Sequence, residues 1–141
     1  PLIEELIKQN PTDAYAYNFL GFSLLEKGEK LDEAFHYISK AVELKPEDGY
    51  IRDSLGWYFY KTGDVERALE ELQKAATAVP DDISIQKHLA IVYGKLKNFS
   101  KAKHYIVNAI GLAKFESEKQ ELKEVLKNLD AQRLPASFLE E

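Results

Sequence analysis

The sequence predicts an all-α fold in which a pair of helices repeats along the chain, and two observations lead to this prediction. Small residues recur at a spacing of 34, at Ala34, Ala68 and Ala102 and again at Ala41, Ala75 and Ala109. Prolines close the repeated segments at Pro11, Pro46 and Pro80. A period of about 34 residues is typical of stacked helix–turn–helix units, each of which buries its apolar face against its neighbour.

The composition is that of an ordinary folded domain and excludes several kinds of site. The 141 residues are 45% hydrophobic and 30% charged, with a formal net charge of −5. This balance disfavours nucleic-acid binding, which needs a clustered basic face. The absence of cysteine excludes disulfides, thiolate zinc sites and iron–sulfur clusters. No apolar run approaches the roughly 20 residues that span a bilayer, so we expect no direct membrane insertion.

Each repeat is predicted to contain two helices whose ends are marked by polar residues and glycines. An aspartate lies two residues after each closing proline, where its carboxylate can cap a helix N-terminus, at Asp13, Asp48 and Asp82. Gly28 and Gly63 lie where a helix C-terminus favours a left-handed residue. Asp64 and Asn98 are candidate caps for the helices that follow two of the turns. The first helices are therefore predicted at 14–27, 49–62 and 83–96, and the second helices at 32–44, 65–79 and 99–113.

Two glycines inside the first helices need a packing reason, because glycine in a helix costs about 1 kcal/mol relative to alanine. Gly21 and Gly56 occupy equivalent positions in the first two repeats. We expect the missing side chains to let the second helices approach closely, at Ala34 and Ala68.

The order Leu55-Gly56, Phe59, Ala68, Leu72, Ala75 and Pro80 resembles the tetratricopeptide repeat. The resemblance extends from residue 11 to about 114 and implies three units, 11–46, 47–80 and 81–114, in one domain spanning 1–141. It further implies a right-handed α-solenoid that binds proteins and has no catalytic activity. Two positions depart from the pattern. The first aromatic, Tyr17, is replaced by Arg52 and Gln86, and the third closing proline by Lys114, so the last helix need not stop there.

Both ends of the chain extend beyond the three units. Residues 115–132 are predicted to form a polar capping helix whose apolar stripe begins at Phe115. Residues 1–10 have the register of a second helix without its partner, and the chain starts at Pro1, so we expect a processed product or a piece of a longer protein. The apolar face of 1–10 either folds onto the first unit or meets another chain, and the residues concerned are Leu2, Ile3, Leu6 and Ile7.

The tail, residues 133–141, has two interpretations. It is either a disordered end or a short peptide ligand for a groove, in this chain or in a neighbouring one. The apolar residues that would carry the second interpretation are Leu134, Phe138 and Leu139.

The resemblance implies that the first helices line a concave groove for a partner. The register places ten candidate partner-binding residues there: Tyr15, Asn18, Phe22, Tyr50, Asp53, Trp57, Tyr60, Lys87, Ile91 and Lys95. Relatives that bind chaperones hold a terminal carboxylate with lysine and asparagine. Asn18 matches one such position, but Phe22 occupies the next and cannot donate a hydrogen bond.

No enzyme, metal site or cofactor is predicted. His36 and His104 lie two units apart, too far to share a metal, and neither a phosphate loop nor a nucleophile motif is present. We predict a protein–protein interaction module that binds itself as a homo-oligomer. The alternative is a scaffold that binds a peptide or helix of another protein.

The segment from Leu31 to Ala75 also resembles the repeat arrays of bacterial cell-envelope lipoproteins. That resemblance implies the bacterial periplasm or envelope, with the cytoplasm as the alternative compartment.

Overall fold

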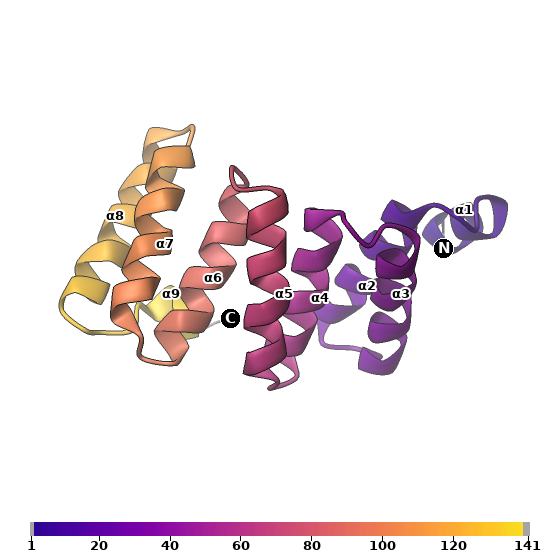
Figure 1. The fold of residues 1–141 in the computed structure, drawn as a ribbon, viewed down its shortest axis with the longest axis horizontal. Coiled ribbons are helices and arrows are strands. Elements are labelled where there is room, and N and C mark those ends of the chain that lie inside the picture. The colour runs from indigo at the N-terminus through magenta and orange to yellow at the C-terminus, as the bar shows by residue number, and fades with distance from the viewer. Residues whose placement is uncertain (1, 140–141) are drawn as a thin grey trace. The chain divides into compact units, whose positions relative to one another are not determined.

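The structure is a computed structural model that describes residues 2–139. The chain divides into two compact units, one ending at Ala78 and the other beginning at Val79, and each is described by itself. The first unit contains α1 (Leu2–Gln9), α2 (Ala14–Lys27), α3 (Leu31–Leu44), α4 (Gly49–Lys61) and α5 (Val65–Ala78). The second unit contains α6 (Ile83–Lys95), α7 (Phe99–Leu112), α8 (Glu116–Asp130) and the short α9 (Ala136–Leu139) (Figure 1).

The predicted helix pairs are confirmed, and the predicted caps explain where the helices begin. The Asp13 carboxylate accepts hydrogen bonds from the backbone N–H groups of Tyr15 and Ala16, at 3.1 and 3.2 Å. Asp48 caps α4 in the same way, and Asp82 caps α6 by accepting from the Ile85 N–H. Gly28 ends α2 in the left-handed region, with φ of 68°. Each first helix therefore starts at the residue predicted from its capping aspartate.

The close approach predicted at the two helix glycines is also confirmed. A Cβ atom on Gly21 would lie 2.6 Å from Ile38 Cγ1 and 2.9 Å from the Ala34 backbone oxygen. A Cβ on Gly56 would lie 2.8 Å from Leu72 Cγ. Both helix pairs thus meet through a contact that a side chain would obstruct.

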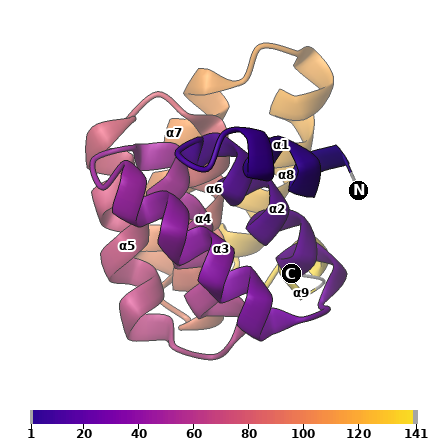
Figure 2. The ribbon, with the colours of Figure 1, turned by 90° about the vertical axis from the view of Figure 1, so that its right-hand side faces the viewer.

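The N-terminal helix α1 is only partly covered. Ile7 packs against a buried cluster of the first unit, and Figure 2 shows α1 beside α2. Leu2 is 75% exposed and Leu6 39% exposed, and no residue of α1 is buried. The expectation that α1 folds onto the first repeat therefore holds for Ile7 but not for Leu2.

The C-terminal end of the third repeat lies close to the predicted boundary, and the capping helix differs from the prediction in one detail. Although Lys114 replaces the closing proline, α7 ends at Leu112, because Ala113 adopts an extended backbone with φ of −66° and ψ of 133°. Phe115 precedes α8 and is 70% exposed, so it does not start the buried stripe of the capping helix. Leu122 and Leu129 form that stripe.

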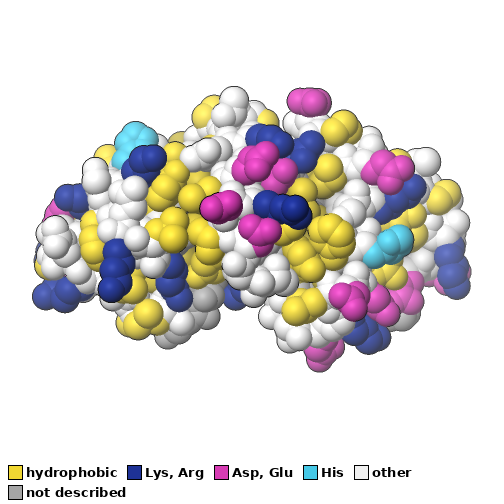
Figure 3. Space-filling model, turned by 60° about the horizontal axis from the view of Figure 1, so that its bottom comes forward, with side chains coloured by type: hydrophobic (Ala, Val, Ile, Leu, Met, Phe, Trp, Pro, Cys, Tyr) yellow, Lys and Arg dark blue, Asp and Glu magenta, His cyan; other side chains and the backbone are white. Residues whose placement is uncertain are grey.

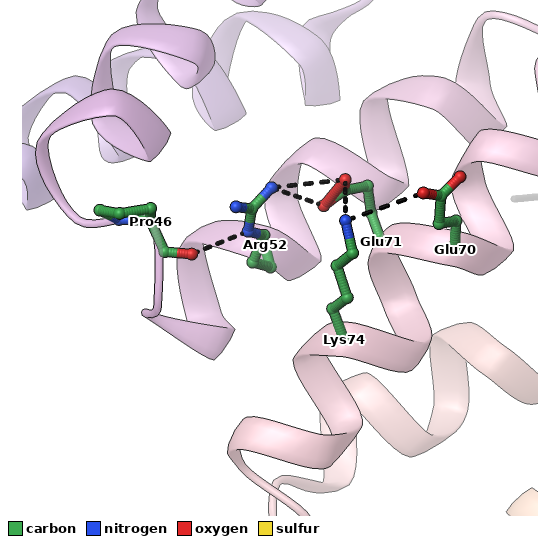
Figure 4. Close-up of polar contacts among 5 residues, drawn as sticks. All are labelled: Pro46, Arg52, Glu70, Glu71 and Lys74. Carbon is green, nitrogen blue, oxygen red and sulfur yellow. Dashed lines mark hydrogen bonds and ion pairs between the residues drawn. The ribbon is translucent and has the colours of Figure 1, made fainter.

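A polar network explains why Arg52 replaces an aromatic residue of the repeat pattern. Its Nε donates to the backbone oxygen of Pro46 at 2.9 Å, and its Nη1 lies 3.0 Å from the Glu71 carboxylate (Figure 4). The Lys74 ammonium lies 3.5 Å from Glu71 and 3.8 Å from Glu70. The guanidinium therefore ties the turn before α4 to α5.

The third repeat uses an uncharged version of this arrangement. The Gln86 side chain donates to the backbone oxygen of Pro80 at 3.4 Å, and Asn108 donates to Gln86 Oε1 at 3.1 Å. In both repeats the residue that replaces the aromatic binds the carbonyl of the preceding proline. The two departures from the family pattern are thus the same structural solution.

Candidate protein-binding faces

The first unit presents an aromatic face, which we define as Tyr15, Phe19 and Phe22 of α2 together with Tyr50 of α4. Tyr15 is 48% exposed, Phe19 60% and Tyr50 51%. A shallow groove of about 590 Å³ runs along α2, and its lining adds Asn18, Ser23, Glu26 and Lys27. Exposed aromatic rings bring a large contact area with few torsions to freeze, which favours protein binding.

Phe19 belongs to this face but is absent from the predicted groove residues. Its position in the sequence could have indicated this, because residues 15, 19 and 22 fall on one face of a helix. Phe19 is the most exposed of the three α2 aromatics.

Tyr15 joins two repeats through its hydroxyl group. It donates a hydrogen bond to one Asp48 oxygen, while the other oxygen of Asp48 caps α4 at Tyr50 and Ile51. The hydrogen bond to Asp48 raises the pKa of Tyr15 above its ordinary value of 10.0, and burial and the Asp48 charge add to the rise. The Lys45 ammonium lies 4.7 Å from the centre of the Tyr15 ring. These contacts hold the ring in one position on the aromatic face.

Asn18 lines the same groove and has an unmet acceptor. Its Oδ1 atom is buried and has no hydrogen-bond partner among the described residues. A buried carbonyl oxygen without a donor costs on the order of 1–3 kcal/mol. A turn of the amide group toward a donor would remove that cost.

Trp57 does not belong to the exposed surface, which corrects the expectation that it lines an open groove. Its side chain is 1% exposed, and its ring stacks on Tyr60 with the centroids 4.7 Å apart. Stacking and burial both stabilise a large flat ring. A position on the concave side of the repeat is therefore not enough to keep the Trp57 ring exposed. Asp53 and Tyr60 are half-buried.

In the second unit, the predicted groove residues and the predicted tail residues come together. Lys87 and Ile91 of α6 line a cavity of about 460 Å³ whose other wall includes Pro135 and Phe138. Phe138 is 4% exposed, while Leu139 is 62% exposed. The tail is thus ordered as far as Leu139 and lies in a groove of its own chain, so the expectation of a disordered end is wrong for these residues. Residues 140 and 141 lie outside the described part.

The histidines and the charge pattern give no indication of other chemistry. His36 and His104 are exposed, and among residues 2–139 no three histidine, aspartate or glutamate side chains gather as metal ligands. Basic side chains are scattered among hydrophobic and acidic ones on the face in Figure 3. Within the described chain, none of the helices has the length and apolarity that a membrane crossing requires.

Comparison with known proteins agrees with the repeat geometry. The tetratricopeptide-repeat family model matches residues 14–48. A structure of PilF from Pseudomonas aeruginosa superimposes with a TM-score of 0.76 at 21% identity, over 84% of this chain and 53% of that one. The structural match shows an α-solenoid fold, and residues 14–48 match one tetratricopeptide repeat. That family is generally a non-catalytic protein-interaction fold.

Two further solved structures share the fold over 84% of this chain. The TPR domain of P58(IPK) has a TM-score of 0.73 at 21% identity, with 33% of that chain covered. The first TPR of Spaghetti (RPAP3), bound to the HSP90 peptide SRMEEVD, has a TM-score of 0.72 at 15% identity, with 90% covered.

Two curated bacterial relatives match parts of the sequence. A TPR repeat-containing protein of Pseudomonas aeruginosa is 37% identical over 76 residues, which are 54% of this chain and 13% of that protein. The bacteriophage adsorption protein A of Escherichia coli K12 is 31% identical over 65 residues, which are 46% of this chain and 7% of that protein. The matched segments are a small part of both relatives.

Proposed function

We propose that this interaction module self-associates through the aromatic face of the first unit and the exposed side of α1. The observation that carries the proposal is the exposure of Tyr15, Phe19 and Tyr50 on neighbouring helices. Single exposed apolar residues are ordinary, but a contiguous aromatic group with an adjoining groove is typical of an interface. The apolar side of α1 adds Leu2 and Leu6.

A closed dimer of this kind would be symmetric, with the same residues contributed by both copies. The Tyr15 ring is held by Asp48 and Lys45, so little side-chain freedom is lost when a partner covers it. The unmet Asn18 acceptor in the groove gives an incoming donor a favourable partner once the amide turns.

The test is multi-angle light scattering across a series from low to high micromolar concentration. We expect the mass to rise with concentration, and Phe19→Glu or Leu2→Glu to shift the rise to higher concentration. Val107→Glu is the matched control, since Val107 is 53% exposed but lies on the second helix of a pair, α7. A strict monomer throughout the series would exclude self-association.

The second candidate function is a scaffold that holds a peptide or helix of a different protein, in a bacterial envelope complex. It is favoured by the RPAP3 structure, in which the same fold holds a peptide, and by the two bacterial relatives. Capture of one stoichiometric partner by the monomeric chain, lost in Phe19→Glu and kept in Val107→Glu, would support it. The same capture with both variants would place the binding site elsewhere.

A further inference from the structure

The tail is positioned by a defined turn at the end of α8. The N–H of Arg133 donates to the Asn128 carbonyl at 2.8 Å, and the N–H of Gln132 donates to the Leu129 carbonyl at 3.0 Å. Gln132 adopts the left-handed region, with φ of 57°. This is the hydrogen-bond pattern of a Schellman motif, which ends a helix and reverses the chain. The tail therefore returns toward α6 by a specified path.

The tail reaches α6 at a notch formed by a glycine. A Cβ atom on Gly94 would lie 2.8 Å from Cε2 and 2.9 Å from Cδ2 of the Phe138 ring, and 3.6 Å from Leu134 Cδ2. The ring therefore occupies space that any other residue at 94 would fill. The helical turn is closed by the Phe138 N–H, which donates to the Pro135 carbonyl at 3.0 Å.

Gly94 has no role in the repeat itself, which makes the notch an additional feature. The glycines that let paired helices approach are Gly21 and Gly56, and Ala90 takes that position in the third repeat. Glycine inside a helix costs about 1 kcal/mol relative to alanine. At Gly94 the compensation comes from a contact with the tail.

The groove beside the docked tail is not filled, and most of the charged side chains that line it are acidic. The cavity of about 460 Å³ is lined by three carboxylates of α8, Glu118, Glu121 and Glu124, against the single ammonium of Lys87. Ser137, the tail residue next to Phe138, also lines it. A segment with a positive charge at that place would meet more opposite than like charge.

We propose that the Gly94 notch is a binding site for the aromatic side chain of a partner peptide, and that residues 134–139 occupy it as an internal competitor. The partner has the chemistry of the tail itself: a proline, a phenylalanine three residues later, and a neutral or basic residue between them. The proposal rests on the interaction function of the fold and adds a second, self-blocked site. It is independent of self-association through the first unit.

The probe is a labelled synthetic peptide of residues 132–139, and its binding to the full chain is followed by fluorescence anisotropy. A tethered tail acts at an effective concentration near millimolar, so the unaltered chain is expected to bind the peptide at least about tenfold more weakly than the Phe138→Ala chain. Adding Gly94→Ala to Phe138→Ala should abolish the gain. Gly111→Ala is the matched control, because a Cβ there meets nothing within 4 Å.

A second measurement does not depend on the Phe138 variant. In hydrogen exchange, the Phe138 amide should be protected in the unaltered chain and in Gly111→Ala, and should lose protection in Gly94→Ala. Equal peptide affinity of the unaltered and Phe138→Ala chains, or equal protection in the two glycine variants, would overturn the proposal.

The partner chemistry is tested with two altered peptides. A peptide with Ser137→Lys should bind the Phe138→Ala chain about two- to fivefold more tightly than one with Ser137→Glu, and the difference should shrink in high salt. Tighter binding of the glutamate peptide would overturn the assignment of a neutral or basic partner. The mass in light scattering reports self-association separately, so failure of one proposal is distinguishable from failure of the other.

Discussion

Replacement of Gly21 by alanine tests whether close helix approach, rather than chain flexibility, explains the glycine. The new Cβ would lie 2.6 Å from Ile38 Cγ1 and 2.9 Å from the backbone oxygen of Ala34. The Ile38 side chain can turn slightly, but the Ala34 oxygen belongs to α3 and moves only if the two helices separate. The substitution therefore sets a gain in helix propensity against a loss of packing.

The packing loss outweighs the propensity gain. Alanine gains about 1 kcal/mol over glycine in a helix, whereas forcing an extra methyl group into a packed core costs roughly 1–3 kcal/mol. Because one obstructing atom is backbone, we take the upper end, which leaves a net loss of about 2 kcal/mol. At about 4 °C per kcal/mol, the Tm should fall by about 8 °C.

Two other glycines make the prediction a graded series. At Gly56 the nearest atoms, 2.8 and 3.0 Å away, belong to the Leu72 side chain, which can yield, so Gly56→Ala should lie between the other two variants. Gly111→Ala meets nothing and should gain about 0.5 kcal/mol in the last turn of α7. Thermal melts followed by circular dichroism and urea unfolding give the order. If Gly21→Ala were as stable as Gly111→Ala, the close-approach argument would be refuted.

Three further predictions concern polar groups and the ligand face. Arg52→Ala leaves the Glu71 carboxylate, 11% exposed, without its guanidinium and should cost roughly 1–3 kcal/mol in urea unfolding; an unchanged midpoint would contradict the network. The pKa of Tyr15 is raised by its hydrogen bond to Asp48, so that bond should persist below pH 10 and be lost as the pH rises through the higher folded pKa. The difference in ultraviolet absorbance between the unaltered chain and Tyr15→Phe should show one phenol titrating above 10, and nearer 10 after Asp48→Asn. The HSP90 peptide SRMEEVD should give no binding heat in calorimetry, because Phe22 cannot donate to its carboxylate; micromolar binding would contradict this reasoning.

The helix boundaries could be predicted because their signals are local. Asp13 and Asp48 mark helix starts by capping backbone N–H groups a few residues away, and Gly28 ends α2 through its own backbone angles. α7 ends at Leu112, one residue before the predicted 113, although Lys114 in place of the closing proline permits a longer helix. Ala113 takes an extended backbone instead.

The exposure of the candidate site could not be predicted from the register. Trp57 occupies a position that the repeat pattern assigns to a groove, yet its ring is buried and stacks on Tyr60. The tail was open to two interpretations because its docking depends on Gly94, some 40 residues earlier in the chain. A glycine inside a helix without a role in the repeat was the signal that could have indicated the notch.

Asp48 couples the stability of the first repeat to that of the second. In a linear array, stability is approximately a sum of the intrinsic terms of each repeat and the coupling between neighbours. Asp48 contributes to both, because one oxygen starts α4 while the other accepts the hydrogen bond from Tyr15 of the repeat before it. Ionisation of one phenol would thus weaken the coupling and leave the intrinsic term of the second repeat intact. At alkaline pH the first repeat should therefore fray more readily, while α4 loses less when α2 frays, so one phenol sets how far the two repeats unfold together.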